Sequence, residues 1–260
     1  MDDAARVAAY TRAGREDGVM APVYLFNTRH ACDVIRPGDV VLDLACGPAT
    51  QLAQIARYNP ASTFIGIDLS EPMLERAAAY LHDQGLVNVR LQRSSIADLS
   101  AFGSESVDAV VSTLALHHLP DVDHLMSTMR EIVRVLRPGG GIYLADFGHL
   151  KSERTIHYFA QQYADRQSDL FTEDYRNSLH AAFPLEVLDS AAAILGERAR
   201  LYTTFLAPYM VAMKSAVRRL DPIDPRWAAA LAALPQHHRT DFADLSAFFA
   251  RGGLRTRLSN

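Results

Sequence analysis

Residues 40–50, VVLDLACGPAT, decide the fold of this chain. An apolar run interrupted only by Asp43 is typical of a parallel strand that is buried on both faces. The small residues from Ala45 to Ala49 indicate a tight turn, and helix-forming sequence begins at Thr50. The stretch therefore predicts a strand, a turn and a helix, with a ligand resting directly against the backbone of the turn.

The turn differs from a dinucleotide-binding loop, which needs glycines in the pattern GxGxxG so that a pyrophosphate can lie against the helix N-terminus. Here Ala45, Gly47 and Ala49 alternate, and Asp43 would repel a pyrophosphate. The Asp43 carboxylate could instead order the amides of the turn or meet a ligand's ammonium group, directly or through water. This pattern disfavours a nicotinamide oxidoreductase.

Further apolar strands alternate with helices along the chain. Strands are predicted at residues 63–68, 87–91, 106–113 and 142–147, with helices at 21–35, 50–59, 70–85 and 121–137. Five strands alternating with helices predict a doubly wound parallel sheet of the α/β class. Residues 150–182 are predicted to be largely helical, another helix begins at Pro184, and a helical tail follows Pro225.

Asp68 closes the second predicted strand, about 20 residues beyond the Gly47 turn. At that separation a βαβ unit returns a carboxylate to the ribose of a bound nucleotide. Two carboxylate oxygens match two vicinal hydroxyls, so we expect Asp68 to bind a ribose. The competing interpretation is that Asp68 caps the next helix, although Ser70 is suited to that position.

Composition limits the function classes. The chain has 260 residues, of which 49% are hydrophobic and 22% charged, and its formal charge is -4. This is the composition of a globular domain, and the acidic balance argues against a nucleic-acid partner. Cys32 and Cys46 do not form a disulfide framework. Without a signal-peptide pattern or a bilayer-spanning apolar run, we expect a cytoplasmic protein with no membrane partner.

Three segments in order resemble class I S-adenosylmethionine-dependent methyltransferases. Residues 43–49 are similar to the family's first motif, Asp-x-Gly-x-Gly-x-Gly, with Ala45 and Ala49 where the family often has Gly. Residues 93–99, RSSIADL, resemble its Gly-Asp-Ala-x-x-Leu loop, and residues 106–121 resemble its Phe-Asp-Val-Val-x-Ser … Leu-His-His-Leu segment. The resemblance covers roughly residues 40–145.

The resemblance implies a Rossmann-like, seven-stranded mixed sheet in which strands at 198–205 and 209–214 form the closing antiparallel pair. It implies S-adenosyl-L-methionine as cofactor, with S-adenosyl-L-homocysteine as product. Ser95 would stand where the family's Asp accepts from the adenine amino group, and Ile96 would offer its backbone amide. Leu69 and Met73 could wall the adenine or belong to the core. The expected cofactor-binding residues are Asp43, Ala45, Gly47, Asp68, Leu69, Met73, Ser95, Ile96, Thr113 and His118.

Thr113 and the following histidines lie at the carboxyl end of a central strand, where open parallel sheets bind ligands. Adjacent side chains point apart, so at most one of His117 and His118 should reach the methyl donor. The alternative is that one imidazole bonds to the backbone and the other is exposed. If the acceptor must lose a proton, His118 and His149 are the candidate bases. No metal site is expected.

We expect one methyltransferase domain, residues 1–260, built around a cofactor-binding core at 39–148. An N-terminal helical segment spans 1–38, and its Tyr10 either folds over the cofactor or packs at a frayed end. The aromatic-rich insertion at 149–183 either roofs an acceptor pocket or packs as a flap. The last helix and closing strands span 184–214. The tail at 215–260 docks on the core or on a second subunit, giving a monomer or a homodimer, and His237 and His238 are expected to be solvated.

The activity that the resemblance implies is in-line methyl transfer to O, N or C of a small metabolite. An acidic chain with an aromatic-rich insertion favours a small, partly aromatic or apolar acceptor. The alternatives are methylation of RNA or protein, and a regulator that binds the cofactor without turnover.

Overall fold

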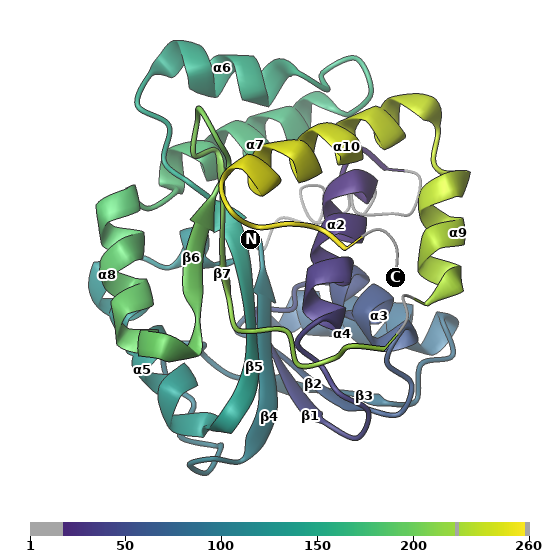
Figure 1. The fold of residues 1–260 in the computed structure, drawn as a ribbon, viewed down its shortest axis with the longest axis vertical. Helices are drawn as coiled ribbons and strands as arrows, with labels where there is room; N and C mark the ends of the chain where they lie inside the picture. The colour runs from purple at the N-terminus through teal and green to yellow at the C-terminus, as the bar shows by residue number, and fades with distance from the viewer. Residues whose placement is uncertain (1–17, 222–223, 258–260) are drawn as a thin grey trace.

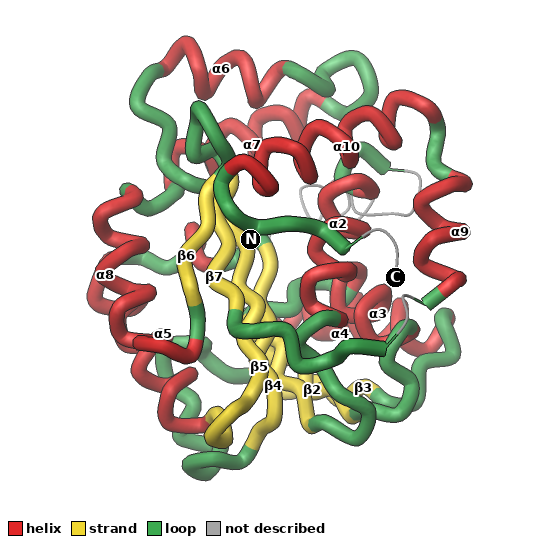
Figure 2. The backbone as a smooth tube through the Cα atoms, viewed as in Figure 1, coloured by secondary structure: helices red, strands yellow, loops and turns green. Residues whose placement is uncertain are grey.

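A computed structural model describes residues 18–221 and 224–257, so Tyr10 lies outside the described part of the chain. These residues form a seven-stranded sheet with helices on both faces (Figure 1; Figure 2, strands yellow). The strand order is β3-β2-β1-β4-β5-β7-β6. The strands are β1 (Val40–Leu44), β2 (Thr63–Asp68), β3 (Val89–Arg93), β4 (Val107–Thr113), β5 (Leu136–Phe147), β6 (Arg200–Thr203) and β7 (Met210–Lys214).

The helices fall between the strands, after β5 and at the end of the chain. The α-helices of the described residues are α2 (Ala21–Cys32), α3 (Thr50–Arg57), α4 (Glu71–Asp83), α5 (Val122–Val135), α6 (Glu153–Gln161), α7 (Asp169–Ala181), α8 (Leu185–Leu195), α9 (Pro225–Ala233) and α10 (Gln236–Arg251). Two short 3₁₀ turns are η1 (Leu116–His118) and η2 (Gly196–Arg198).

Strands β1 to β5 are parallel, and β7 runs antiparallel to both of its neighbours, β5 and β6. The predicted doubly wound, seven-stranded mixed sheet is confirmed, as are the helical insertion after β5 and the helical tail. In the register, Asp43 of β1 lies between Gly66 of β2 and Val111 of β4. The carboxyl ends of these three strands therefore meet at one edge of the sheet.

Alternate residues of each central strand face opposite sides of the sheet, so each strand contributes to two cores. Val41 packs with α2 and α3 residues, whereas Leu42 packs with α5 and α8 residues. Helices α5 and α8 cover one face and contact each other (Figure 1). Helices α6, α7 and α10 lie beyond the upper end of the strands in that view.

Strand β5 begins earlier than the sequence predicts. The run Pro138–Gly141, expected to separate a helix from the strand, belongs to β5 itself. Leu136 pairs with Val107, and after a register shift Gly141 pairs with Ala109. The positive φ of Gly139, 71°, lets the chain bulge there without steric cost, so glycines that usually end an element are here absorbed into one.

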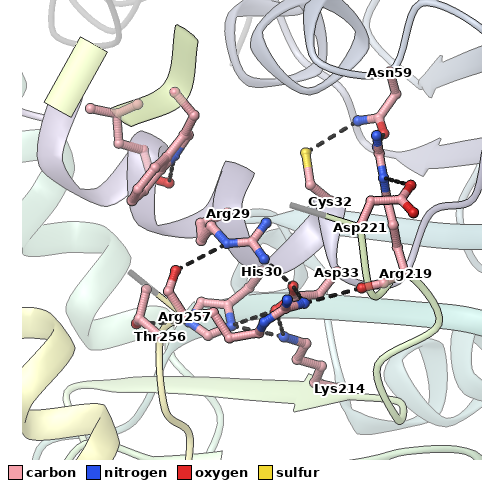
Figure 3. A network of polar contacts seen from close by, with 12 residues as sticks. Arg29, His30, Cys32, Asp33, Asn59, Lys214, Arg219, Asp221, Thr256 and Arg257 are labelled. Atoms are coloured by element: carbon pink, nitrogen blue, oxygen red, sulfur yellow. Dashed lines mark hydrogen bonds and ion pairs between the residues drawn. The ribbon is translucent and has the colours of Figure 1, made fainter. Parts of the chain in front are cut away.

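A buried charge network joins segments far apart in the sequence (Figure 3). Asp33, just after α2, bonds to Arg29 and to Lys214 of β7, at 2.7 Å for the latter. Arg257 lies 3.5 Å from the same carboxylate. His30 bridges Lys214 Nζ, at 2.9 Å, and Thr256 Oγ1, at 3.1 Å. The network therefore ties α2 to the closing strand and to the C-terminal tail.

His238 corrects one expectation, because its side chain is buried rather than solvated. It lies on α10, which packs against α2. Among the described residues, no single helix is both long and apolar enough to cross a membrane. The pair Asp169–Ala181 and Leu185–Arg198 reaches the required length and composition only together, with a bend of 71° between them.

Candidate active site

A cavity of about 830 Å³ opens at the carboxyl ends of β1, β2 and β4. This is the place where open parallel sheets bind their ligands. All ten residues expected to bind the cofactor line it: Asp43, Ala45, Gly47, Asp68, Leu69, Met73, Ser95, Ile96, Thr113 and His118. Residues from four separate strand ends are thus brought to one space.

The turn after β1 forms one wall of the cavity and has an alternating left-handed backbone. Ala45, Gly47 and Ala49 have φ values of 56°, 53° and 61°. The two alanines occupy a region that normally favours glycine, at a cost of about 1–2 kcal/mol each. The surrounding sheet and α3 hold the turn in this shape, which leaves the backbone of Gly47 open on the side where a Cβ would lie.

Asp68 is held in place by two backbone amides at the end of β2. Its Oδ2 accepts from Gly47 N and its Oδ1 accepts from Ser70 N, both at 2.9 Å. Asp68 therefore does bond to the start of α4, as the capping interpretation holds. Each carboxylate oxygen has two lone pairs, so both oxygens retain capacity for a ligand's hydroxyl groups.

Asp43 adds a second carboxylate to the same wall, and its side chain is 4% exposed. Burial, followed by the charge of Asp68, raises the pKa of Asp43 well above its ordinary value. The unliganded protein therefore bears an electrostatic cost at this wall. A cationic ligand group would reduce that cost, because an opposite charge favours the ionised carboxylate.

The two adjacent histidines of η1 have different environments. His117 is buried, and its Nδ1 lies 2.6 Å from Asp146 Oδ1 at the end of β5. His118 is exposed and lines the cavity. One ring alone faces the cavity, as expected, but the other ring bonds to a carboxylate rather than to the backbone. Desolvation by the surrounding protein, followed by the charge of His117, lowers the pKa of His118.

The structure does not bring His149 to this site, since it is not among the residues that line the cavity. No residue of the insertion 149–183 lines the cavity either. Its buried aromatic rings pack inward, with Tyr175 against Phe147 at 5.3 Å and Phe159 stacked on Tyr209 at 4.4 Å between centroids. These contacts pack the insertion against Phe147 of β5 and against Tyr209, the residue before β7.

Several cavity residues escaped the sequence analysis, among them Tyr24 of α2, Gln51 of α3 and His124 of α5. Gln51 is buried, and its amide donates to Thr28 Oγ1 at 2.8 Å, while its Oε1 has no hydrogen-bond partner in the part of the chain that the structure describes. A buried acceptor at a cavity wall is suited to a ligand's donor group. The position of Gln51 in its helix did not indicate that it would line the cavity, because its contact with α2 depends on how the two helices pack.

The wall chemistry fits a charged nucleoside ligand. It offers an open backbone turn, a paired carboxylate for hydroxyl groups, a second carboxylate for a cation, and apolar surface at Leu69 and Met73. Among residues 18–221 and 224–257, no cluster of three or more His, Cys, Asp or Glu side chains could hold a metal ion.

Comparisons with known proteins agree with this geometry. Residues 41–140 match the family model described as a methyltransferase domain. The chain is 30% identical over 217 residues to trans-aconitate 2-methyltransferase of Deinococcus radiodurans, covering 82% of this chain and 76% of the relative. The chain belongs to the class I S-adenosylmethionine-dependent methyltransferases.

Two more comparisons place this methyltransferase among its relatives. It is 36% identical over 110 residues to nocamycin O-methyltransferase of Saccharothrix syringae, covering 42% of this chain and 38% of that one. Its fold is similar to that of a SAM-dependent methyltransferase from Aquifex aeolicus, with a TM-score of 0.53, 15% identity and coverage of 83% and 94% of the two chains. Its cofactor is S-adenosylmethionine.

Proposed function

We propose that this methyltransferase transfers a methyl group to an oxygen, nitrogen or carbon atom of a small metabolite. The observation that carries the proposal is the single cavity that gathers the turn after β1, Asp43, Asp68 and His118 at one edge of the sheet. The names of the two relatives support the substrate class, since one acts on trans-aconitate and the other is named for nocamycin.

The proposed cofactor site uses separate walls for separate groups. Asp68 binds the ribose hydroxyls, while Asp43 and Gln51 Oε1 meet the ammonium group of the methionine end. Leu69, Met73, Ser95 and Ile96 surround the adenine, and Thr113 lies beside the methionine end. The support for each role is its position in the lining of the cavity. The carboxylates also make this wall unfavourable for a polyphosphate.

When bound, S-adenosylmethionine supplies a methyl group on an activated sulfonium, so that little chemical assistance is needed beyond alignment. The chain's own contribution is to hold the acceptor in line, exclude water and remove a proton. His118 is the cavity histidine suited to that last task, because its lowered pKa keeps the imidazole neutral near pH 7. It would accept the proton that an acceptor hydroxyl or amine loses.

Calorimetry with S-adenosylhomocysteine tests the cofactor site. Replacing Asp68 by Ala should weaken binding by about 1.5–3 kcal/mol, because charge-assisted hydrogen bonds to the ribose are lost. Asp68→Asn, which keeps the shape of the side chain, should weaken it less. Asp98→Ala, an exposed carboxylate outside the cavity lining, is the control. Unchanged affinity in Asp68→Ala would refute the ribose assignment.

The acceptor class needs a different measurement. The protein should transfer labelled methyl from S-adenosylmethionine to a compound below the size cut-off of a small-metabolite extract. Matched incubations with RNA and with protein fractions should remain unlabelled. Label in either macromolecular fraction, or cofactor binding without product in any extract, would overturn the small-metabolite proposal.

A further inference from the structure

The pair formed by His117 and Asp146 lies directly behind the cavity wall and has no part in the cofactor site. Asp146 is 2% exposed and accepts three hydrogen bonds, from His117 Nδ1 at 2.6 Å, Phe147 N at 2.6 Å and His117 N at 3.1 Å. Both the ring and the backbone of His117 are therefore fixed by one carboxylate.

The remaining ring nitrogen of His117 is unusual. Its Nε2 is buried and has no hydrogen-bond partner among the described residues. Leaving a buried polar atom unpaired costs about 1–3 kcal/mol, so such an atom calls for an explanation. Because Asp146 is ionised and contacts Nδ1, the Nδ1 atom donates to the carboxylate.

The His117 ring also contacts the ring that faces the cavity. The centroids of His117 and His118 lie 4.0 Å apart, and on its other side His117 meets Phe147 at 5.2 Å. Phe147 in turn packs against Tyr175 of α7. His118 is thus held between the cavity and a fixed, buried imidazole whose position is set by β5 and the insertion.

We propose that Asp146 and His117 are positioning residues that hold the His118 imidazole against the cavity. The inference rests on the proposed role of His118 at this cavity. An imidazole on an exposed 3₁₀ turn could otherwise rotate freely and bind a proton from solvent. The buried His117 ring, fixed by Asp146, restricts that rotation by ring contact.

Groups on η1 and β5 act on the pKa of His118, and a further histidine of α5 lies at the same cavity. His117 lies on its own turn and lowers its pKa, whereas Asp146 on β5 raises it. His124 of α5 lines the same cavity and is paired with Asp121 at 2.7 Å. That exposed His–Asp pair resembles the buried one in chemistry and differs from it in burial, so it supplies a matched control.

Nuclear magnetic resonance of protein labelled with ¹⁵N in histidine tests the proposal without any acceptor. In the wild-type protein, His117 should show a protonated Nδ1, and His118 should titrate below the ordinary value of about 6.5. His117→Gln and His118→Gln assign the two rings. A bare Nδ1 on His117 would overturn the proposal in the unmodified protein.

Two variants move the His118 titration in opposite directions. His117→Gln removes a neighbouring charge that lowers the His118 pKa, so it should raise that pKa by about one unit. Asp146→Asn removes an anion and should lower the His118 pKa. A general loosening of the fold would instead move the His118 pKa of both variants toward its ordinary value. Asp121→Asn should leave it unchanged. Equal midpoints in wild type, His117→Gln and Asp146→Asn would contradict the proposal.

S-adenosylhomocysteine affinity separates this inference from the proposed function. If the wild-type protein binds it and His118 titrates independently of His117 and Asp146, the positioning role fails and the cofactor site stands. If the wild-type protein does not bind it, the proposed cofactor site itself fails.

Discussion

Lys214 Nζ lies 2.7 Å from Asp33 Oδ2, although the two residues are 181 positions apart, and both side chains are at most 5% exposed. Arg29 bonds to the same carboxylate and Arg257 lies beside it. A single buried anion therefore balances cations from a helix, a strand and the tail. Burial of this kind makes each partner necessary once the others are present.

Replacing Asp33 by Asn should lower the free energy of unfolding by about 3–5 kcal/mol, because it leaves buried cations without their counter-charge. Urea denaturation followed by circular dichroism measures the change. Asp83→Asn serves as the control, since Asp83 and its neighbour His82 are exposed. That control should stay within about 0.5 kcal/mol of the wild type. A similar small effect for Asp33→Asn would show that the network does not stabilise the fold.

The stability of the protein should fall in mild acid because of His30. Burial, followed by the charges of Lys214 and Arg29, holds the pKa of His30 well below its ordinary value. Below about pH 6.5 the unfolded chain binds a proton here that the folded chain excludes. The free energy of unfolding should therefore fall, for this group, by up to about 1.4 kcal/mol per pH unit.

Denaturation of wild type and His30→Gln between about pH 7.5 and about pH 5.5 checks this sign. The wild type should lose more stability than His30→Gln over that interval. His82→Gln, at a fully accessible surface position, should follow the wild-type slope. Parallel slopes for all three proteins would exclude His30 as the acid-sensitive group.

The Asp43 carboxylate should lower the stability of the unliganded protein and strengthen its binding of S-adenosylhomocysteine. Because its pKa is raised in the folded protein, the folded state loses stability as the pH rises above the ordinary value of 3.8. Asp43→Asn should raise the unfolding temperature of the unliganded protein at pH 7 by about 2–4 °C. The gain should shrink toward about pH 4, where the unfolded chain also begins to protonate this carboxyl.

The same variant should bind S-adenosylhomocysteine about tenfold more weakly, a change of about 1.4 kcal/mol, because an ammonium group loses its counter-charge. Thermal unfolding and calorimetry on one preparation supply both values. A variant that lost stability and kept its affinity would reverse both halves of the expectation.

Ala45 should tolerate glycine better than a helical alanine does. Glycine removes the steric cost of the left-handed conformation, which stabilises the folded state by about 1–2 kcal/mol. Its greater freedom in the unfolded chain destabilises the folded state by about 0.5–1 kcal/mol. Ala45→Gly should therefore be neutral or stabilising by up to about 1.5 kcal/mol. Ala53→Gly, inside α3, should cost about 1 kcal/mol. Equal losses for the two variants would show that the positive φ of Ala45 carries no strain.

Much of the fold could be predicted from the sequence, because the strand signals are strong. Continuous apolar runs ending in Asp43 and Asp68 located β1 and β2, and the parallel arrangement follows from strands that alternate with helices. The cavity residues were predictable for the same reason. Carboxyl ends of parallel strands share one edge, so residues that follow the strands meet there.

What the sequence did not predict depends on side-chain direction and on tertiary packing. Asp146 lies one residue before the end of β5, as Asp43 does in β1, yet its pairing with His117 depends on how η1 folds back. The inward packing of the insertion and the burial of His238 are likewise set by neighbouring helices. The residues Pro138–Gly141 are typical of a turn, yet pairing with β4 makes them part of β5.

The antiparallel strand β7 lies between β5 and β6, although β6 precedes it in the chain. During synthesis β6 therefore leaves the ribosome with no strand to pair with, and the edge of β5 stays open until residue 214 has emerged. Open strand edges invite association between chains. A chain that stops shortly before Met210 would thus leave the edge of β5 exposed, and β7 covers that edge once residues 210–214 have emerged.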